Sequence, residues 1–405
     1  MIFRGWRVVA ASFALLAVIF GAAYSFGPLF ESFQRDFGAS RAGISGVFAL
    51  AGVLYFLVGL PAGLLADRFG PRWVVLPGIV ALAAGLVAAS RARTLGELYW
   101  AYAAGFGLGV GLVYVPAVGA IQPWFVRRRG LASGLGVAGI GVGTLVVPPA
   151  AAALIPLLGW RDTLVALACV LGAVGAVAAF HVDNRPHRFG VGPDGDAPAV
   201  DAAGRAPGGA RPAGGLTLRG ALGRADLWWL YLVIVLATTG QFMAFVHLVP
   251  HARDMGFSQP QGALLVALLG LGSMVGRFAV GGFADRLGRQ RSLAVALAGL
   301  CGCMVLWRLA GSIGALAAFA LLHGTLTGVV VALYPSLVAD RFGARSVGGL
   351  IGFLYTGAAV ANLAGPYGAG WWYDRSGGYG AAILAAAAAY ALACAAVWRL
   401  PAARA

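Results

Sequence analysis

A single arginine, Arg277, interrupts the apolar stretch GLGSMVGRFAVGGFADRLGRQR, which begins at Gly270. The next charged residue along the chain is Asp285, and on a helix with a rise of about 1.5 Å per residue it lies about 12 Å away. An arginine side chain reaches about 6–7 Å, so Arg277 cannot bring its charge to the end of such a helix. A cation left inside a bilayer costs about 2.5–3.5 kcal/mol, and this cost calls for a partner.

No acidic side chain is placed to be that partner. The chain has 14 aspartate and glutamate residues, and all of them fall in loops or at the ends of apolar runs. A guanidinium offers paired donors in the geometry that a carboxylate accepts. We therefore predict that Arg277 binds a carboxylate of the substrate.

The sequence offers no set of residues for covalent chemistry. It contains no nucleophile–base arrangement, no phosphate loop and no metal-ligand spacing, so we expect no enzyme activity, no metal and no cofactor. The run GLGVAGIGVG contains Gly-x-Gly-x-x-Gly, but no strand precedes it. Small residues that let membrane helices pack closely explain this run better. The four cysteines lie in apolar runs and are interpreted as packing residues.

Membrane-spanning helices must hold these residues. Hydrophobic residues make up 60% of the chain and charged residues 11%, against about 25% charged residues in a soluble protein. Apolar runs of about 20 residues, long enough to cross a hydrocarbon core, recur without the period of two that a β-barrel requires. We predict helices at residues 6–30, 42–66, 72–90, 97–122, 130–157, 162–181, 226–252, 259–284, 292–310, 313–337, 346–371 and 379–398.

The predicted fold is an all-α membrane protein with twelve transmembrane helices in two pseudo-symmetric six-helix bundles. The bundles occupy residues 1–181 and 226–405. Residues 182–225 are rich in Gly, Ala and Pro and are predicted to form a flexible cytoplasmic linker.

The two halves carry related sequences. GLLADRFGPR (Gly63–Arg72) follows the second predicted helix, and GGFADRLGRQ (Gly281–Gln290) follows the eighth. Their aspartates, Asp67 and Asp285, are 218 residues apart. This spacing indicates an internal repeat.

The charges predict the orientation. All 29 basic residues are arginines, and 20 of them lie in segments on the side of the N-terminus, against 8 in the opposite loops. The positive-inside rule then places both termini in the cytoplasm. The net charge of +15 is therefore a topology signal and does not indicate a nucleic-acid partner. The arginine-only, alanine-rich composition favours a bacterial inner membrane.

The repeated loop resembles the Gly-x-x-x-Asp-Arg-x-Gly-x-Arg signature of the major facilitator superfamily. The first copy is complete, whereas Gln290 replaces the last arginine of the second copy. The resemblance implies that these loops clasp helix ends on the cytoplasmic side and regulate opening. The predicted gating residues are Gly63, Asp67, Arg68, Gly70, Arg72, Gly281, Asp285, Arg286 and Gly288.

Further stretches resemble the monocarboxylate transporters and their bacterial oxalate–formate exchanger relatives. They are GWRVVAASF…YSFGPLFESF, WFVRRRGLASGLGVAGIGVG, FVHLVPHARDMGFS and GPYGAGWWYDRSGGY. Two departures stand out. The chain has no lysine, although many animal members carry one in the first helix, and Ser273 stands where many carry an aspartate.

The resemblance implies a cavity lined by the first, fourth, seventh and tenth helices, in which the helix-eight arginine binds the substrate carboxylate. Tyr114, about 12 Å before Gln122, then lies at a depth similar to that of Arg277. It is a candidate partner for a substrate hydroxyl or oxo group, although tyrosine is also a common interfacial anchor. The other predicted substrate-binding residues are Tyr24, Phe26, Leu145, Tyr334 and Tyr355.

Proton coupling is predicted at His247, Asp254 and Arg277. Histidine titrates near neutrality, but a neutral His247 bonded to a helix carbonyl is an equal alternative. The family analogy makes Asp254 a second candidate. Straight helices would separate it from Arg277 by more than about 20 Å.

Together these features predict a transporter for small monocarboxylates such as lactate or pyruvate, working by alternating access with proton symport. We expect it to function as a monomer. The alternatives are an exchanger of organic anions of the oxalate–formate type and a membrane sensor that does not transport. Drug or cation efflux is disfavoured because no carboxylate lies in mid-membrane.

Overall fold

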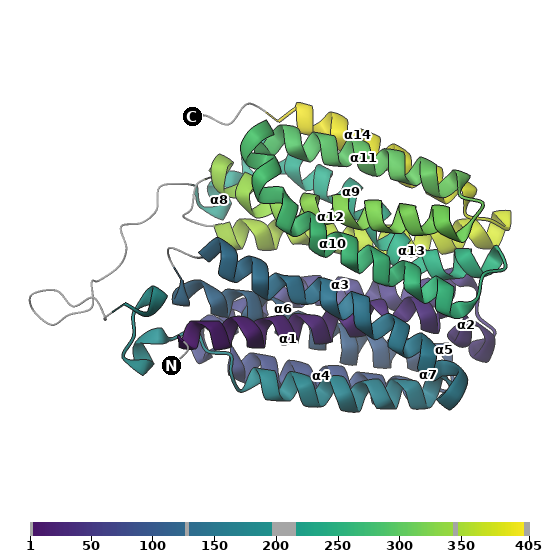
Figure 1. Ribbon diagram of the computed structural model, residues 1–405, viewed down its shortest axis with the longest axis horizontal. Coiled ribbons are helices and arrows are strands. Elements are labelled where there is room, and N and C mark those ends of the chain that lie inside the picture. Colours follow the sequence, from purple (N-terminus) through teal and green to yellow (C-terminus); the bar gives the residue numbers. More distant parts are fainter. Residues whose placement is uncertain (1–2, 126–128, 197–215, 343–346, 401–405) are drawn as a thin grey trace, which may run out of the picture.

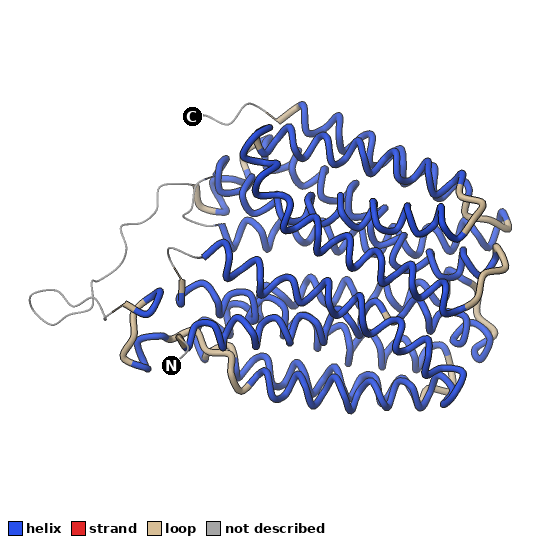
Figure 2. Tube along the Cα trace, viewed as in Figure 1, coloured by secondary structure: helices blue, strands red, loops and turns tan. Residues whose placement is uncertain are grey.

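The computed structural model describes residues 3–125, 129–196, 216–342 and 347–400, and all regular structure in these ranges is helical (Figures 1 and 2). We call the helices up to residue 179 the first half of the molecule. They are α1 (Arg4–Tyr24), α2 (Phe26–Phe37), α3 (Arg41–Phe69), α4 (Arg72–Ser90), α5 (Leu95–Trp100), the π-helical turn η1 (Ala101–Gly107), α6 (Leu108–Ile121), the 3-10 turn η2 (Gln122–Trp124) and α7 (Arg129–Ala179).

We call the long helices from residue 225 onward the second half. They are α9 (Ala225–Asp254), α10 (Gln259–Leu287), α11 (Arg289–Leu309), α12 (Ile313–Phe342), α13 (Val347–Ser376) and α14 (Gly380–Trp398). In Figure 1 the first half lies below the second, with α3 and α10 near the boundary.

The number of crossings agrees with the twelve predicted helices. Ten described segments are long and apolar enough to cross a membrane. One of them includes both predicted helices five and six, because α7 turns back at Gly159, where φ is 77°. The 30-residue α13 supplies the remaining crossing. The prediction of an all-α, multi-span membrane protein is therefore confirmed.

Both termini lie at the same end of the bundle (Figure 1). We call this the terminal end and the opposite one the distal end. The first predicted helix is longer than expected. It bends at Ser25 and continues as α2 to Phe37 at the distal end.

Glycines allow close contacts between helices. A methyl group on Gly143 of α7 would lie 2.1 Å from the Ala17 carbonyl oxygen of α1. A methyl group on Gly276 of α10 would lie 1.9 Å from the Thr325 carbonyl oxygen of α12. Larger residues at these positions would force the helix pairs apart, as the interpretation of the glycine runs predicts.

The two signature loops share one backbone geometry. Gly70 ends α3 with φ 97° and Gly288 ends α10 with φ 78°, a region that residues with a Cβ rarely adopt. Gln290, the departure from the motif, donates to the carbonyls of Val397 (2.8 Å) and Leu400 (3.0 Å) at the end of α14. In the first half, the Arg72 guanidinium lies 4.2 Å above the Phe180 ring beyond α7. Each loop thus reaches the last helix of its own half.

Some predicted gating side chains lie outside the described residues. The structure gives helical backbone for Asp67, Gly281, Asp285 and Arg286, and their side chains are not described. Arg68 is exposed, and its carbonyl accepts a hydrogen bond of 3.2 Å from Arg185.

Part of the predicted linker differs from a flexible chain. Its described residues include the 3-10 turns η3 (Pro186–Phe189) and η4 (Pro193–Gly195) and the short helix α8 (Leu218–Leu222). The Phe189 ring stacks on Trp124 at 6.0 Å, and the Arg4 guanidinium lies 3.7 Å from it. This aromatic residue ties the segment to the terminal end, and the domain boundaries at 181 and 226 stay a prediction.

Candidate functional site

Arg277 projects from α10 just after the glycine that contacts α12. The residue is half-buried, and its Nε and Nη1 atoms are buried without a hydrogen-bond partner among the described residues. Buried donors of a charged group are costly when they are left unsatisfied. The structure therefore places a guanidinium where an added acceptor would gain two hydrogen bonds.

Tyrosines from three other helices lie near this guanidinium. Tyr24 of α1, Tyr114 of α6 and Tyr355 of α13 are close enough to Arg277 to interact with it electrostatically. The Tyr114 and Tyr355 hydroxyls are within hydrogen-bonding reach of each other. Tyr55 of α3 packs edge-on against Tyr114, with ring centroids 5.8 Å apart. Phenol groups of both halves thus face one cation.

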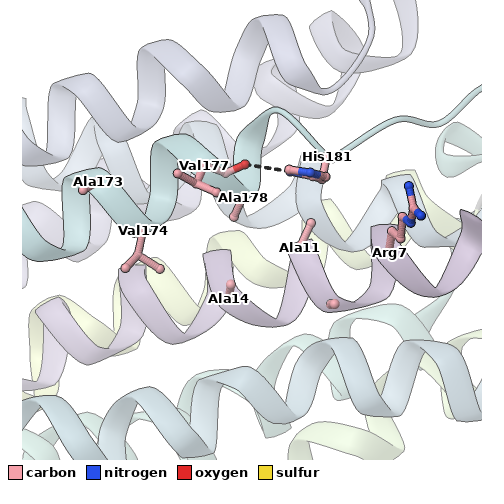
Figure 3. Close-up of a pocket in the computed structure, with 9 residues that line it drawn as sticks. Arg7, Ala11, Ala14, Ala173, Val174, Val177, Ala178 and His181 are labelled. Carbon is pink, nitrogen blue, oxygen red and sulfur yellow. Dashed lines mark hydrogen bonds between the residues drawn. The ribbon is translucent and has the colours of Figure 1, made fainter.

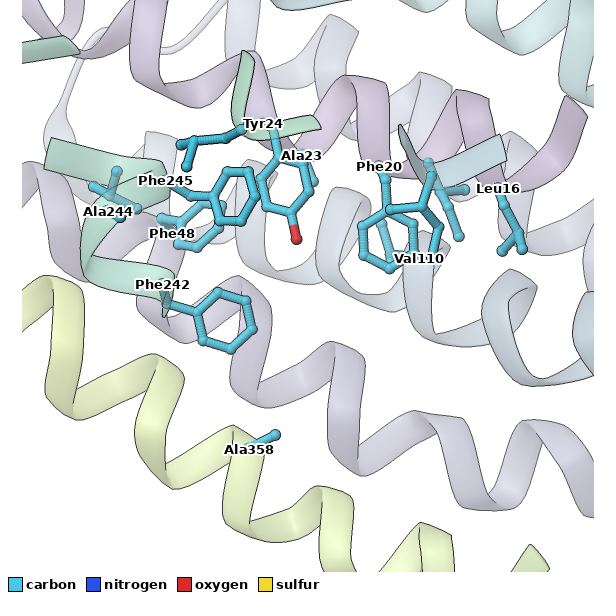
Figure 4. Close-up of a cluster of buried hydrophobic side chains, with 14 of the residues drawn as sticks. Leu16, Phe20, Ala23, Tyr24, Phe48, Val110, Phe242, Ala244, Phe245 and Ala358 are labelled. Carbon is cyan, nitrogen blue, oxygen red and sulfur yellow. The ribbon is translucent and has the colours of Figure 1, made fainter. Parts of the chain in front are cut away.

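Aromatic rings pack around Tyr24 in a buried hydrophobic cluster (Figure 4). The Tyr24 ring stacks on Phe245 of α9 at 3.9 Å, so a first-half ring meets a second-half ring. Phe20 lies one turn before Tyr24 and packs edge-on against Tyr114 at 5.6 Å. Figure 4 also shows Phe242 of α9 on the same side of the cluster. A cation beside phenols and apolar rings suits a small organic anion, whose charge would meet the cation and whose carbon chain would contact the rings.

Tyr334 also belongs near the site. It is 4% exposed, its hydroxyl has no partner among the described residues, and it interacts electrostatically with Tyr355. Leu145 is half-buried on α7, next to Thr144, which a methyl group on Gly270 of α10 would meet at 2.6 Å. Leu145 thus lies on the helix pair that joins the halves, but no described contact links it to the phenols.

The structure does not bring Phe26 to Arg277. Phe26 is 1% exposed and packs edge-on against Phe30 at the start of α2 and against Tyr102 of η1. Phe26 follows the bend at Ser25, and no described contact links it to Tyr24, Tyr114 or Tyr355, so its role in substrate binding stays a prediction. Tyr55 is a phenol that the prediction missed, because it lies in the second predicted helix, from which no substrate-binding residue was expected.

His247 is fully buried and hydrogen bonded on both ring nitrogens. Its Nε2 lies 2.8 Å from the Pro366 carbonyl oxygen, which can only accept, so Nε2 carries a proton. Its Nδ1 lies 2.9 Å from the Tyr379 hydroxyl. The Tyr379 oxygen accepts a hydrogen bond from Nη1 of Arg41, so the phenol proton is available to donate to Nδ1 of a neutral imidazole. This geometry matches the alternative of a neutral histidine bonded to a helix carbonyl.

Asp254 has a partner, and it is not Arg277. Its Oδ1 accepts a hydrogen bond of 2.6 Å from Nη2 of Arg41, the first residue of α3. In the sequence, Arg41 lies in a predicted loop between two helices, where an arginine indicates topology and no other role. Its position directly after Ser40, which caps α3, marked it only as a helix start.

A groove of about 630 Å³ lies away from this site, between α1 and the end of α7 (Figure 3). Alanine and valine side chains form most of its lining, with Arg7 and His181 at one end. His181 Nδ1 is 2.9 Å from the Val177 carbonyl oxygen. The groove contains none of the predicted substrate residues and lacks the converging polar groups of a solute site. Within the described chain, no three His, Cys, Asp or Glu side chains are grouped to hold a metal.

The site can be set beside known proteins. The model of the Major Facilitator Superfamily matches residues 12–316 of this chain. Monocarboxylate transporter 13 of Bos taurus is 28% identical over 390 residues, covering 95% of this chain and 86% of that protein. Monocarboxylate transporter 12-B of Danio rerio is 28% identical over 93% of this chain and 82% of its own length. Monocarboxylate transporter 11 of Homo sapiens is 31% identical over 94% of this chain and 79% of its own length.

Proposed function

The chain belongs to the major facilitator superfamily, and on that premise we propose that it carries small monocarboxylates such as lactate or pyruvate together with a proton. It is a multi-pass membrane protein and a secondary transporter related to the monocarboxylate transporters. One observation carries the substrate proposal. Arg277 has two buried nitrogen donors without a partner among the described residues, and three phenols lie near enough to interact with it.

The number of cations favours one carboxylate over two. Each charge taken from water needs compensation, because an unpaired ion in a low dielectric costs several kcal/mol. In the part of the chain that the structure describes, Arg277 is the only cation that interacts with Tyr24, Tyr114 and Tyr355. The one amide on α13, Asn362, donates to the Ala49 carbonyl at 3.0 Å and is therefore already engaged. A dianion such as oxalate would be left half compensated.

The proton would travel with the substrate, so that one anion and one proton cross together without net charge. His247 and Asp254 on α9 are the candidate carriers, in addition to the pair of Arg277 with its substrate. The arginine count favours cytoplasmic termini and therefore an extracellular distal end. Under this orientation Asp254 and His247 lie near the outer entrance.

The proposal is tested by a thermal-shift screen of the purified protein against lactate, pyruvate, propionate, oxalate and succinate. A ligand that binds the folded state raises the melting temperature, so the monocarboxylates should raise it most. The Arg291→Lys variant, which alters an exposed arginine of the same half, serves as a control and should behave like the parent. Stronger stabilisation by oxalate or succinate would overturn the single-cation argument and favour the organic-anion exchanger.

A further inference from the structure

Arg41 is held almost entirely by the opposite half of the molecule. It begins α3 in the first half, and 10% of its side chain is exposed. Its Nη2 donates to Asp254 of α9 at 2.6 Å, and its Nη1 donates to the Tyr379 hydroxyl at 2.6 Å. Its guanidinium lies 3.9 Å from the centre of the Tyr373 ring of α13. Charge-assisted bonds of this kind are roughly twice as strong as neutral ones.

The backbone at Arg41 is bound to the second half as well. The two carboxylate oxygens of Asp374 accept from the backbone N–H groups of Arg41 and Ala42, both at 3.0 Å. These groups belong to the first turn of α3, where helix donors lack partners within the helix and favour a negative charge. A methyl group on Gly370 would lie 2.8 Å from the Ala42 nitrogen, so α13 can approach α3 this closely only with glycine there.

A buried row of hydrogen bonds continues inward from this contact. The Tyr379 hydroxyl accepts from Arg41 and donates to His247, whose Nε2 donates to the Pro366 carbonyl oxygen. Ser45, one turn into α3, lies 3.1 Å from the same His247 nitrogen and donates to the Arg41 carbonyl at 2.7 Å. The row therefore crosses from α3 to α9 and α13 with each donor and acceptor matched.

Polar contacts between the halves are concentrated at the distal end. Besides those of Arg41, Ala42 and Ser45, the described hydrogen bonds between α1–α7 and α9–α14 are Arg253 to Glu31, Gln259 to the Pro28 carbonyl, and Asn362 to the Phe48 and Ala49 carbonyls. No hydrogen bond or ion pair between described residues joins the halves at the terminal end. The distal contacts hold the two halves together at this end.

We propose that Arg41, Asp254, Asp374 and Tyr379 form a latch that holds the distal end of the transporter shut, with Arg41 as its central positioning residue. Opening the distal end separates α3 from α9 and α13, so it must break every bond of the latch at once. The Arg253–Glu31 pair crosses the same boundary, but both side chains are about a third exposed. Asp254 is exposed to a similar extent, at 31%, but Arg41 is only 10% exposed and also bonds to Tyr379 and, through its backbone, to Asp374. The latch therefore holds the distal end more strongly than this pair does. The inference concerns the two halves and holds whatever solute is carried.

The test measures the distance across the distal end. Spin labels are attached at Arg35→Cys on α2 and Gly311→Cys before α12, both exposed, after replacing Cys169, Cys301, Cys303 and Cys394 by alanine. Pulsed electron paramagnetic resonance in nanodiscs then gives the distance distribution. Arg41→Ala should raise the ratio of long-distance to short-distance species by at least about tenfold. Tyr379→Phe keeps the ring, and it should shift the ratio in the same direction by less.

Two matched variants separate the latch from a general loss of stability. Arg161→Ala removes a distal arginine whose carboxylate partner, Asp36, lies in the same half, so the distribution should stay unchanged. Arg253→Ala removes the exposed pair between the halves and should have a smaller effect than Arg41→Ala. A distribution that is unchanged in both Arg41→Ala and Tyr379→Phe would overturn the proposal. So would an equal shift in Arg161→Ala. The two proposals can fail separately. If Arg41→Ala shifts the distance distribution but no carboxylate stabilises the protein, the latch is supported and the proposed substrate is refuted.

Discussion

Two arginines of this protein lie in poorly hydrated surroundings, and they differ in whether the protein supplies hydrogen-bond partners for them. Arg41 finds a carboxylate, a phenol and an aromatic ring in the folded chain. Arg277 finds phenols, and two of its donors stay unpaired among the described residues. A folded protein rarely retains such a deficit without a ligand, because an unpaired buried charge is costly. The contrast supports the proposal that Arg277 binds the substrate, whereas Arg41 is engaged within the protein.

At this scale we predict that substitution of Arg277 weakens binding strongly. Arg277→Lys keeps a charge but loses the planar fork, and Arg277→Ala loses both. Hydrogen bonds to a charged group contribute about 1.5–3 kcal/mol, so affinity for pyruvate should fall roughly 10- to 150-fold. Isothermal titration calorimetry measures the dissociation constant. Near-parental affinity in both variants would refute the role of Arg277.

The Tyr114 hydroxyl should distinguish among monocarboxylates. Tyr114→Phe removes one neutral hydrogen bond, which contributes about 0.5–1.5 kcal/mol, so affinity for lactate should fall roughly two- to twelvefold. Propionate has no hydroxyl or oxo group, and its affinity should not change. Tyr367→Phe, which alters an exposed tyrosine of α13, is the control. Equal losses for lactate and propionate would show that Tyr114 acts through packing alone.

At the scale of elements, glycine decides how closely the helices pack. The run that contains Gly134 and Gly143 lies on α7 and faces different surroundings at its two ends. A methyl group on Gly143 would meet the α1 backbone, whereas one on Gly134 would meet no atom within 4 Å. The same residue type therefore has a packing role at one position and none at the other.

We predict that Gly143→Ala destabilises the protein and Gly134→Ala does not. Overpacking against backbone atoms costs about 1–3 kcal/mol, because the Ala17 carbonyl cannot rotate away as a side chain would. Alanine at the open position 134 instead favours the helix by up to about 1 kcal/mol. Thermal unfolding in detergent measures both variants. Equal melting temperatures for the two would contradict the close approach of α1 and α7.

At the scale of the whole molecule, transport requires the two halves to exchange the distal closure seen here for a terminal one. Arg277 on α10, Tyr355 on α13 and Phe245 on α9 belong to the second half, and Tyr24 and Tyr114 to the first. Separation of the halves at either end would therefore open a path to the same residues. This arrangement is the one that alternating access needs.

We predict that a proton gradient drives uptake of labelled lactate into liposomes that contain the protein. An acidic exterior should cause accumulation, and a protonophore should abolish it, because each anion enters with a proton. His247→Gln and Asp254→Asn should reduce the dependence on the gradient more than they reduce binding. Uptake that ignores the gradient but requires internal carboxylate would instead identify an exchanger.

The sequence by itself determined the crossings and the cation at their centre. Lipid offers no hydrogen bonds to the backbone, so each apolar run must form a helix whatever its neighbours are. The positions of Gly70 and Gly288 were also fixed locally, because a positive φ after a helix favours glycine. Arg277 could be found because a charge deep in an apolar run is costly regardless of the helix packing.

Only the tertiary structure decided which side chains meet. Arg41 and Asp254 are 213 residues apart, and Arg41 and Tyr379 are 338 apart. Counting along a straight helix gave the depth of Asp254 but could not give its neighbour on another helix. The same limit hid Tyr55, and it could not show that Phe26 packs against Phe30 and Tyr102. Depth follows from the rise of one helix, whereas contact depends on how two halves of the chain close against each other.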